Sequence, residues 1–119
     1  MAASLFKAIG GHDWSYSRKL IYGASRGQIG QLAIAVAAAA GTDPQARDIL
    51  QRAGHELARL GSALVARFGV RPIVLGGRVP QLHQLIEQSM KERLPPECEL
   101  RLVNLQAHIA AARLALKKV

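Results

Sequence analysis

Residues 72–81 read PIVLGGRVPQ, and this stretch predicts where a strand ends and a helix begins. Residues 72–75 form an uninterrupted apolar run, as expected for a strand that is covered on both faces. Pro80 suits the first turn of a helix, because that position needs no amide hydrogen. Between them stand Gly76 and Gly77, and glycine tolerates positive φ and lets another group approach the backbone. The glycine pair therefore indicates either a tight strand-to-helix turn or a surface on which a flat ligand lies.

The sequence after this stretch predicts a helix, a second strand and a last helix. Pro95 and Pro96 end the helix that begins at Pro80, and its inward positions are expected to be Leu82, Leu85, Ile86 and Met90. Residues 99–103 partly alternate, as a strand does, and residues 106–117 form a helix whose small-residue face is Ala107, Ala110, Ala111 and Leu114. A right-handed crossover would make the two strands parallel. Two strands are few for a covered sheet, so we expect a helix-rich α/β chain that is part of something larger.

The sequence before this stretch predicts one long amphipathic helix over residues 44–68. Asp43 can cap its first turn, Pro44 fits the first helical position, and Gly69 ends it. Its apolar positions recur in steps of three and four, which predicts one buried face made of Ile49, Leu50, Ala53, Leu57, Leu60, Leu64 and Phe68.

Three shorter helices are expected nearer the N-terminus, over residues 4–9, 14–22 and 25–40. Asp13 is the expected N-cap of the second helix, and Ser25 starts the third. The third carries an apolar stripe of Ile29, Leu32, Ala33, Val36 and Ala37. We therefore read residues 1–119 as a single, partial domain, with N-terminal helices over 1–41 and the long helix, both strands and their helices over 42–119.

Composition restricts the class of protein. Half of the 119 residues are hydrophobic, which is enough for a core and argues against disorder. The net charge is +8, but the basic residues are spread along the chain and the few aromatic residues are scattered, so we expect neither a nucleic-acid nor a membrane partner. Cys98 is the one cysteine and cannot form an internal disulfide, which favours a cytoplasmic location.

Motifs for independent catalysis are absent from the sequence. There is no Walker loop and no G-x-G-x-x-G pattern. The four histidines (His12, His55, His83 and His108) share no metal-ligand spacing, and Cys98 has no histidine close to it in the sequence. We therefore predict no catalytic residue and no metal ligand.

Three segments together resemble a known family. They are IYGASRGQIGQLAIAVAAAAGTDPQARDILQRAGHELARL (residues 21–60), PIVLGGRVP (residues 72–80) and AHIAAARLAL (residues 107–116). The chain resembles the C-terminal half of N-acetylglucosamine kinases and of the related ATPases that activate 2-hydroxyacyl-CoA dehydratases and benzoyl-CoA reductases. These enzymes belong to the superfamily that contains actin and the sugar kinases.

The resemblance implies a partial ribonuclease-H-like domain, the second domain of the actin-like ATPase fold. It implies that Gly76 and Gly77 lie against the adenine and ribose of ATP, with Arg78 close to the phosphates. It also brings Gly27 and Gln28 to the border of the nucleotide pocket. Mg²⁺ would enter only with the nucleotide and the N-terminal half of the family's fold. Ala110 stands where the family usually has glycine in its interdomain helix.

The same comparison shows which parts of the family this sequence lacks. It has no aspartate-bearing, glycine-rich hairpin for Mg²⁺ and the phosphates, and no catalytic aspartate pattern. We therefore expect a C-terminal fragment that binds an adenine nucleotide and is inactive alone. The alternative is a non-catalytic binding module that pairs with another chain, either as a homodimer or with a complementary N-terminal half.

Overall fold

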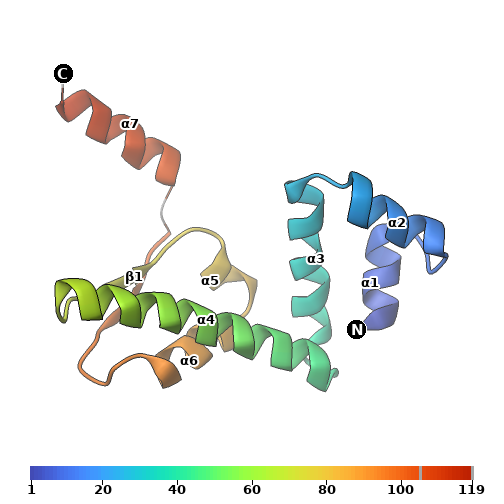
Figure 1. Ribbon diagram of the computed structural model, residues 1–119, viewed down its shortest axis with the longest axis horizontal. Helices are drawn as coiled ribbons and strands as arrows, with labels where there is room; N and C mark the ends of the chain where they lie inside the picture. Colours follow the sequence, from blue (N-terminus) through green and yellow to red (C-terminus); the bar gives the residue numbers. More distant parts are fainter. Residues whose placement is uncertain (105, 119) are drawn as a thin grey trace.

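The computed structural model describes residues 1–104 and 106–118. Within these residues the elements are, in chain order, α1 (Ala2–Ile9), α2 (Trp14–Gly23), α3 (Arg26–Ala39), α4 (Pro44–Phe68), β1 (Ile73–Leu75), α5 (Val79–Leu82), α6 (Gln84–Arg93), β2 (Leu100–Leu102) and α7 (Ala107–Lys117). Figure 1 shows α4 running from the end that holds α1, α2 and α3 to the end that holds β1, with α6 next to it. The chain is therefore a helix-rich α/β protein with a two-stranded sheet, as the sequence predicts.

The two strands are parallel, which confirms the expected pairing. Ile73 pairs with Leu100, Val74 with Arg101 and Leu75 with Leu102. Leu75 is buried, but Val74 is 55% exposed. The expectation that both faces of this strand are covered is therefore wrong, because α4 and α6 pack on one face of the sheet and leave the other open.

The long helix α4 has the predicted length, but only part of its predicted face is buried. Leu50 is buried and Ala53 and Leu57 are half-buried, as expected. Ile49, Leu60, Leu64 and Phe68 are exposed, whereas the buried positions are Ala46, Leu50, Gly54, Ala58 and Gly61. These small residues bring α6 very close. A Cβ added at Gly54 would lie 2.4 Å from the carbonyl oxygen of Ile86. Small residues are buried here because they let the backbones of two helices approach closely. The spacing of apolar residues in the sequence does not predict this.

The helix expected from Pro80 onward is split in two. α5 ends at Leu82, His83 is extended with a φ of −164°, and α6 begins at Gln84. The His83 Nδ1 atom accepts a 3.1 Å hydrogen bond from the Leu85 amide and so caps the new helix. Ile86 and Met90 are buried as predicted.

The N-terminal helices follow the predicted boundaries closely. Ser25 and Gln28 form a capping box, in which each side chain accepts a hydrogen bond from the other residue's amide. Asp13 precedes α2 but makes no side-chain cap. The stripe expected on α3 is only partly right, because Ile29 is 48% exposed and the buried residues gather at the other end, at Val36, Ala39 and Ala40. That end packs against α4 and Ile86.

The C-terminal helix α7 packs poorly. It contains no buried residue, so the small-residue face predicted for it is not in use. In Figure 1 it projects from the end of β2, away from the other helices. The Cα radius of gyration is 17.5 Å, whereas about 13.5 Å is typical for a compact chain of this length.

Candidate functional site

The Gly76-Gly77 turn lies at the carboxyl end of β1, directly before α5. In open α/β sheets ligands bind outside the carboxyl ends of parallel strands. Gly77 has a φ of +80°, and a Cβ added there would meet no heavy atom within 4 Å. The backbone conformation explains why glycine stands at this position. Among the residues that the structure describes, the space at the Cβ position of Gly77 is open.

Arg78 is exposed and adopts a helical conformation as the N-cap of α5. α5 has only 4 residues, so its dipole is too short to attract phosphate at this turn. Arg78 is therefore the cation that the chain itself places beside the turn.

Gly27 and Gln28 lie in the first turn of α3, and the structure does not join them to the glycine turn in one cavity. The Gln28 side chain accepts a 2.8 Å hydrogen bond from the Ser25 amide. It also lines a cavity between α1, α2 and α3, and neither Gly76 nor Gly77 is part of that lining. Helical geometry places Gln28 roughly 16 Å along α3 from Ala39, near which α5 packs.

This cavity between α1, α2 and α3 was missed by the reasoning from sequence. Its volume is about 910 Å³. One wall depends on a second glycine pair, Gly10 and Gly11, because a Cβ at Gly11 would lie 2.6 Å from the Tyr16 ring. A glycine pair followed at short range by a tyrosine was the available signal, and only the folded chain shows that the ring lies on the glycines.

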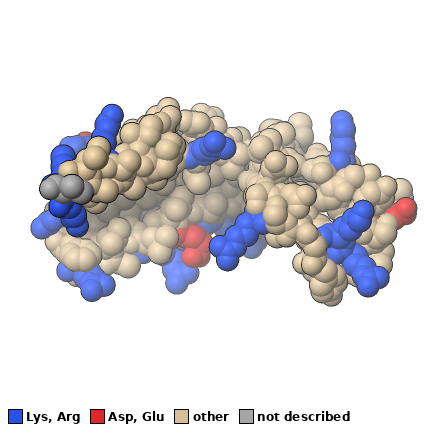
Figure 2. Space-filling view, turned by 90° about the horizontal axis from the view of Figure 1, so that it is seen from above, with Lys and Arg blue, Asp and Glu red and all other residues tan. Residues whose placement is uncertain are grey.

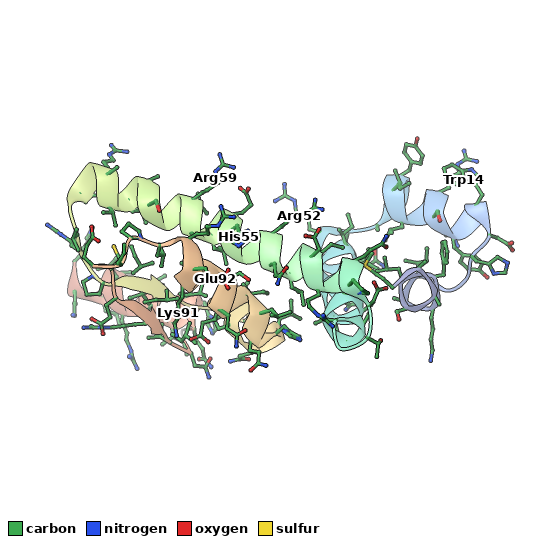
Figure 3. The ribbon with its side chains drawn as sticks, turned by 90° about the horizontal axis from the view of Figure 1, so that it is seen from below. Trp14, Arg52, His55, Arg59, Lys91 and Glu92 are labelled. Carbon is green, nitrogen blue, oxygen red and sulfur yellow. The ribbon has the colours of Figure 1, made fainter. Side chains whose placement is uncertain are left out.

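Two contacts between titratable groups lie outside these sites. The N-terminal amine of Met1 hydrogen-bonds to Asp43 and, with the amides of Gln45 and Ala46, holds the pKa of that carboxyl below its usual value. His55 of α4 faces Glu92 of α6, as Figure 3 shows, with 3.7 Å between Nε2 and Oε2. Nε2 is buried and makes no hydrogen bond to the described residues, so the two side chains lie near each other without a hydrogen bond between them.

The charged surface is basic and dispersed. Figure 2 shows Lys and Arg along the whole length of one face, with few acidic residues among them. Several cations of α4 and α6 pair with acidic neighbours: Arg52 with Asp48, Arg59 with Glu56 and Lys91 with Glu87. Within residues 1–104 and 106–118, no three His, Cys, Asp or Glu side chains gather as metal ligands would.

None of the helices in the described ranges has the length and apolar character that crossing a membrane requires. Comparison with known proteins returned no match, whether to protein families, to curated proteins or to solved structures.

Proposed function

We propose that this chain is the C-terminal nucleotide-binding portion of a sugar-kinase-like ATPase, similar to N-acetylglucosamine kinases, and that it does not transfer phosphate by itself. The observation that carries the proposal is the Gly76-Gly77 turn at the carboxyl end of a parallel strand, with open space at the Cβ position of Gly77. Adenine and ribose would lie against the turn, where a larger residue would occupy the space that a flat ring needs.

Arg78 is the side chain that we expect to contact the phosphates. It is an exposed cation beside the turn, and a guanidinium pairs well with phosphate oxygens. Phosphoryl transfer additionally needs a metal and a group that positions the nucleophile. Mg²⁺ would therefore be held through the nucleotide and a complementary N-terminal half.

The test is a calorimetric titration of ATP, with and without Mg²⁺, into the chain and two matched variants. Gly77→Val places a side chain where the ring would stack, and we expect it to abolish binding. Gly69→Val is the control, because Gly69 also has a positive φ, of +86°, and open space around its Cβ position. Circular dichroism checks that both variants keep their helices. Equal ATP affinity for the chain and Gly77→Val would refute the adenosine site.

A second candidate function is pairing with another chain, and the exposed surface favours it. The accessible surface is 8957 Å², about 2,700 Å² more than the roughly 6,300 Å² expected for a compact monomer of this mass. A standard interface removes about 800 Å² from each partner. The uncovered apolar side chains include Val74 and Leu102 of the sheet, Leu60, Leu64 and Phe68 of α4, and Leu114 and Leu116 of α7.

Light scattering after gel filtration at micromolar concentration tests this candidate. We expect a symmetric dimer, since a chain that exposes this much apolar surface gains free energy when it is buried. A monomer that unfolds cooperatively would contradict pairing and would leave nucleotide binding untouched. ATP binding by a dimer would support both candidates together.

A further inference from the structure

We propose a second, independent ligand site in the cavity between α1, α2 and α3, which takes a single-chain amphiphile with an anionic head, such as a long-chain carboxylate. The cavity is about 910 Å³ in volume, within the range of roughly 300–1,000 Å³ that small-molecule sites occupy. It shares no lining residue with the Gly76-Gly77 turn, so it does not rest on the nucleotide proposal.

The walls of the cavity are predominantly apolar. Ile9 comes from α1, Leu20 from α2, and Leu32 and Ile34 from α3, and alanines fill the positions between them. Ile34 is 62% exposed, and neither α1 nor α2 contains a buried residue. The chain itself therefore leaves this apolar surface in contact with solvent, and a ligand with an apolar tail would bury it.

The polar part of the lining points to an anionic head. Lys19 is the one charged residue of the lining, and no acidic residue is part of it. The ion pairs found among residues 1–104 and 106–118 do not include Lys19. Gln31 and Tyr16, which also line the cavity, are neutral residues with hydrogen-bonding side chains. A carboxylate bound beside Lys19 would gain a charge-assisted hydrogen bond, which a neutral head would not.

Charge also argues against the alternative occupant, α7 of a second copy. α7 and the residue after it carry Arg113, Lys117 and Lys118 and no acidic residue. Placing that helix beside Lys19 would bring like charges together in a site without a compensating anion. An anionic ligand would be attracted by Lys19, whereas a basic helix would be repelled by it.

The turn between α1 and α2 holds the Tyr16 wall in place. Cβ atoms at Gly10 and Gly11 would lie 3.0 and 2.6 Å from atoms of the Tyr16 ring. The ring therefore rests directly on the glycine backbone, and its position is set by contacts inside the chain. The Tyr16 side of the cavity is therefore formed without a ligand.

The experiment is a calorimetric titration of dodecanoate, kept below its micelle concentration, into the intact chain. We expect saturable binding at one site per chain. Lys19→Gln should weaken the affinity at least tenfold, whereas Lys7→Gln should leave it unchanged, because Lys7 is exposed on α1 and is not part of the lining. Ala35→Phe should abolish binding by filling the cavity, and circular dichroism should show that its helices remain.

Two further titrations decide between occupants. Dodecanol, which has the same tail and no charge, should bind at least tenfold more weakly than dodecanoate. Equal affinities for the two, or a Lys19→Gln variant that binds dodecanoate normally, would overturn the proposal. Absence of saturable dodecanoate binding would overturn it too. Tight binding of a synthetic peptide of residues 107–118, lost in Ala35→Phe, would also overturn it and assign the cavity to a second copy.

Discussion

The α4–α6 crossing and the Gly76-Gly77 turn both depend on glycine, but for opposite reasons. At the crossing, a Cβ on Gly54 would lie 2.4 Å from the Ile86 carbonyl oxygen and 2.6 Å from the Ser89 Cβ, so the space is already filled by this chain. At the turn, a Cβ on Gly77 would meet nothing within 4 Å. One glycine is needed for packing and the other for its positive φ.

The comparison teaches how to read a glycine in a sequence. Gly54 lies inside an uninterrupted helix, where glycine normally destabilises, and its use becomes clear only when α6 is placed against it. Gly77 lies between a strand and a helix, where a turn explains it at once. The open space at the Cβ position of Gly77 is where the proposed ligand would lie.

The largest effect is expected at the crossing. Gly54→Ala should lower the free energy of unfolding by about 2 kcal/mol, because the neighbour is backbone and cannot move aside cheaply. Gly30→Ala is the matched control, since Gly30 is also helical and its Cβ position is open. That variant should gain about 0.5–1 kcal/mol from helix propensity. Urea unfolding measures both, and equal signs would contradict the packing explanation.

A smaller loss is expected at the turn. Gly77→Ala should cost about 1 kcal/mol, because an L-residue is strained at a φ of +80° even where space is free. Gly77→Asn should cost less than Gly77→Ala, since asparagine tolerates the left-handed region better. Thermal unfolding of the two variants separates strain from packing. If asparagine were as costly as alanine, the conformational explanation would fail.

A still smaller effect is expected at Gly61, a second buried glycine of α4, whose nearest neighbour is a side chain rather than backbone. Its Cβ would lie 2.8 Å from Leu94 Cδ2, the far end of a flexible side chain. Leu94 can shift, and the gain in helix propensity offsets the strain. We expect Gly61→Ala to change the free energy of unfolding by less than about 0.5 kcal/mol. A loss as large as that of Gly54→Ala in the same urea series would show that the whole α4–α6 crossing is rigid.

The smallest effect is expected from acid and concerns the start of α4. The pKa of Asp43 is lowered in the folded chain, first by the Met1 amine and then by the Gln45 and Ala46 amides. Its contribution to stability is therefore complete above the unfolded-state pKa, near 3.8, and is lost as pH falls through the lower folded pKa. Unfolding followed between pH 6 and pH 2 should show a shallower acid dependence for Asp43→Asn. An unchanged profile would remove Asp43 as a contributor.

Much of the secondary structure could be predicted from local signals. Asp43 and Pro44 at the start of α4, Gly69 at its end and the Ser25 capping box each act within a few residues, and the structure has them where the sequence indicates. His83 is the exception, because its extended conformation splits one expected helix in two. An interior histidine carries no breaker signal, so its role as a cap depends on the final path of the chain.

The candidate site was predictable only as a position in the chain. The Gly76-Gly77 turn is at the end of β1 as expected, yet Gln28 lines a cavity that does not include this turn. Sequence spacing cannot show which elements meet in space, and the resemblance that linked these residues concerns a larger fold. The Tyr16 wall of the α1–α3 cavity was hidden for the same reason, although its glycines stand close to it in the sequence.

The sequence alone determined most of the order of helices and strands, the caps at Ser25 and Asp43 and the parallel pairing, because propensity, capping and crossover connections depend on short stretches of chain. Tertiary structure alone decided which positions of α4 are the most buried. The apolar pattern pointed correctly to Leu50 but wrongly to Leu60 and Leu64, and closeness to α6 selected Gly54 and Ala58. The physical reason is that burial on α4 depends on the distance between the α4 and α6 backbones. Small residues where the two helices meet allow that distance to be short.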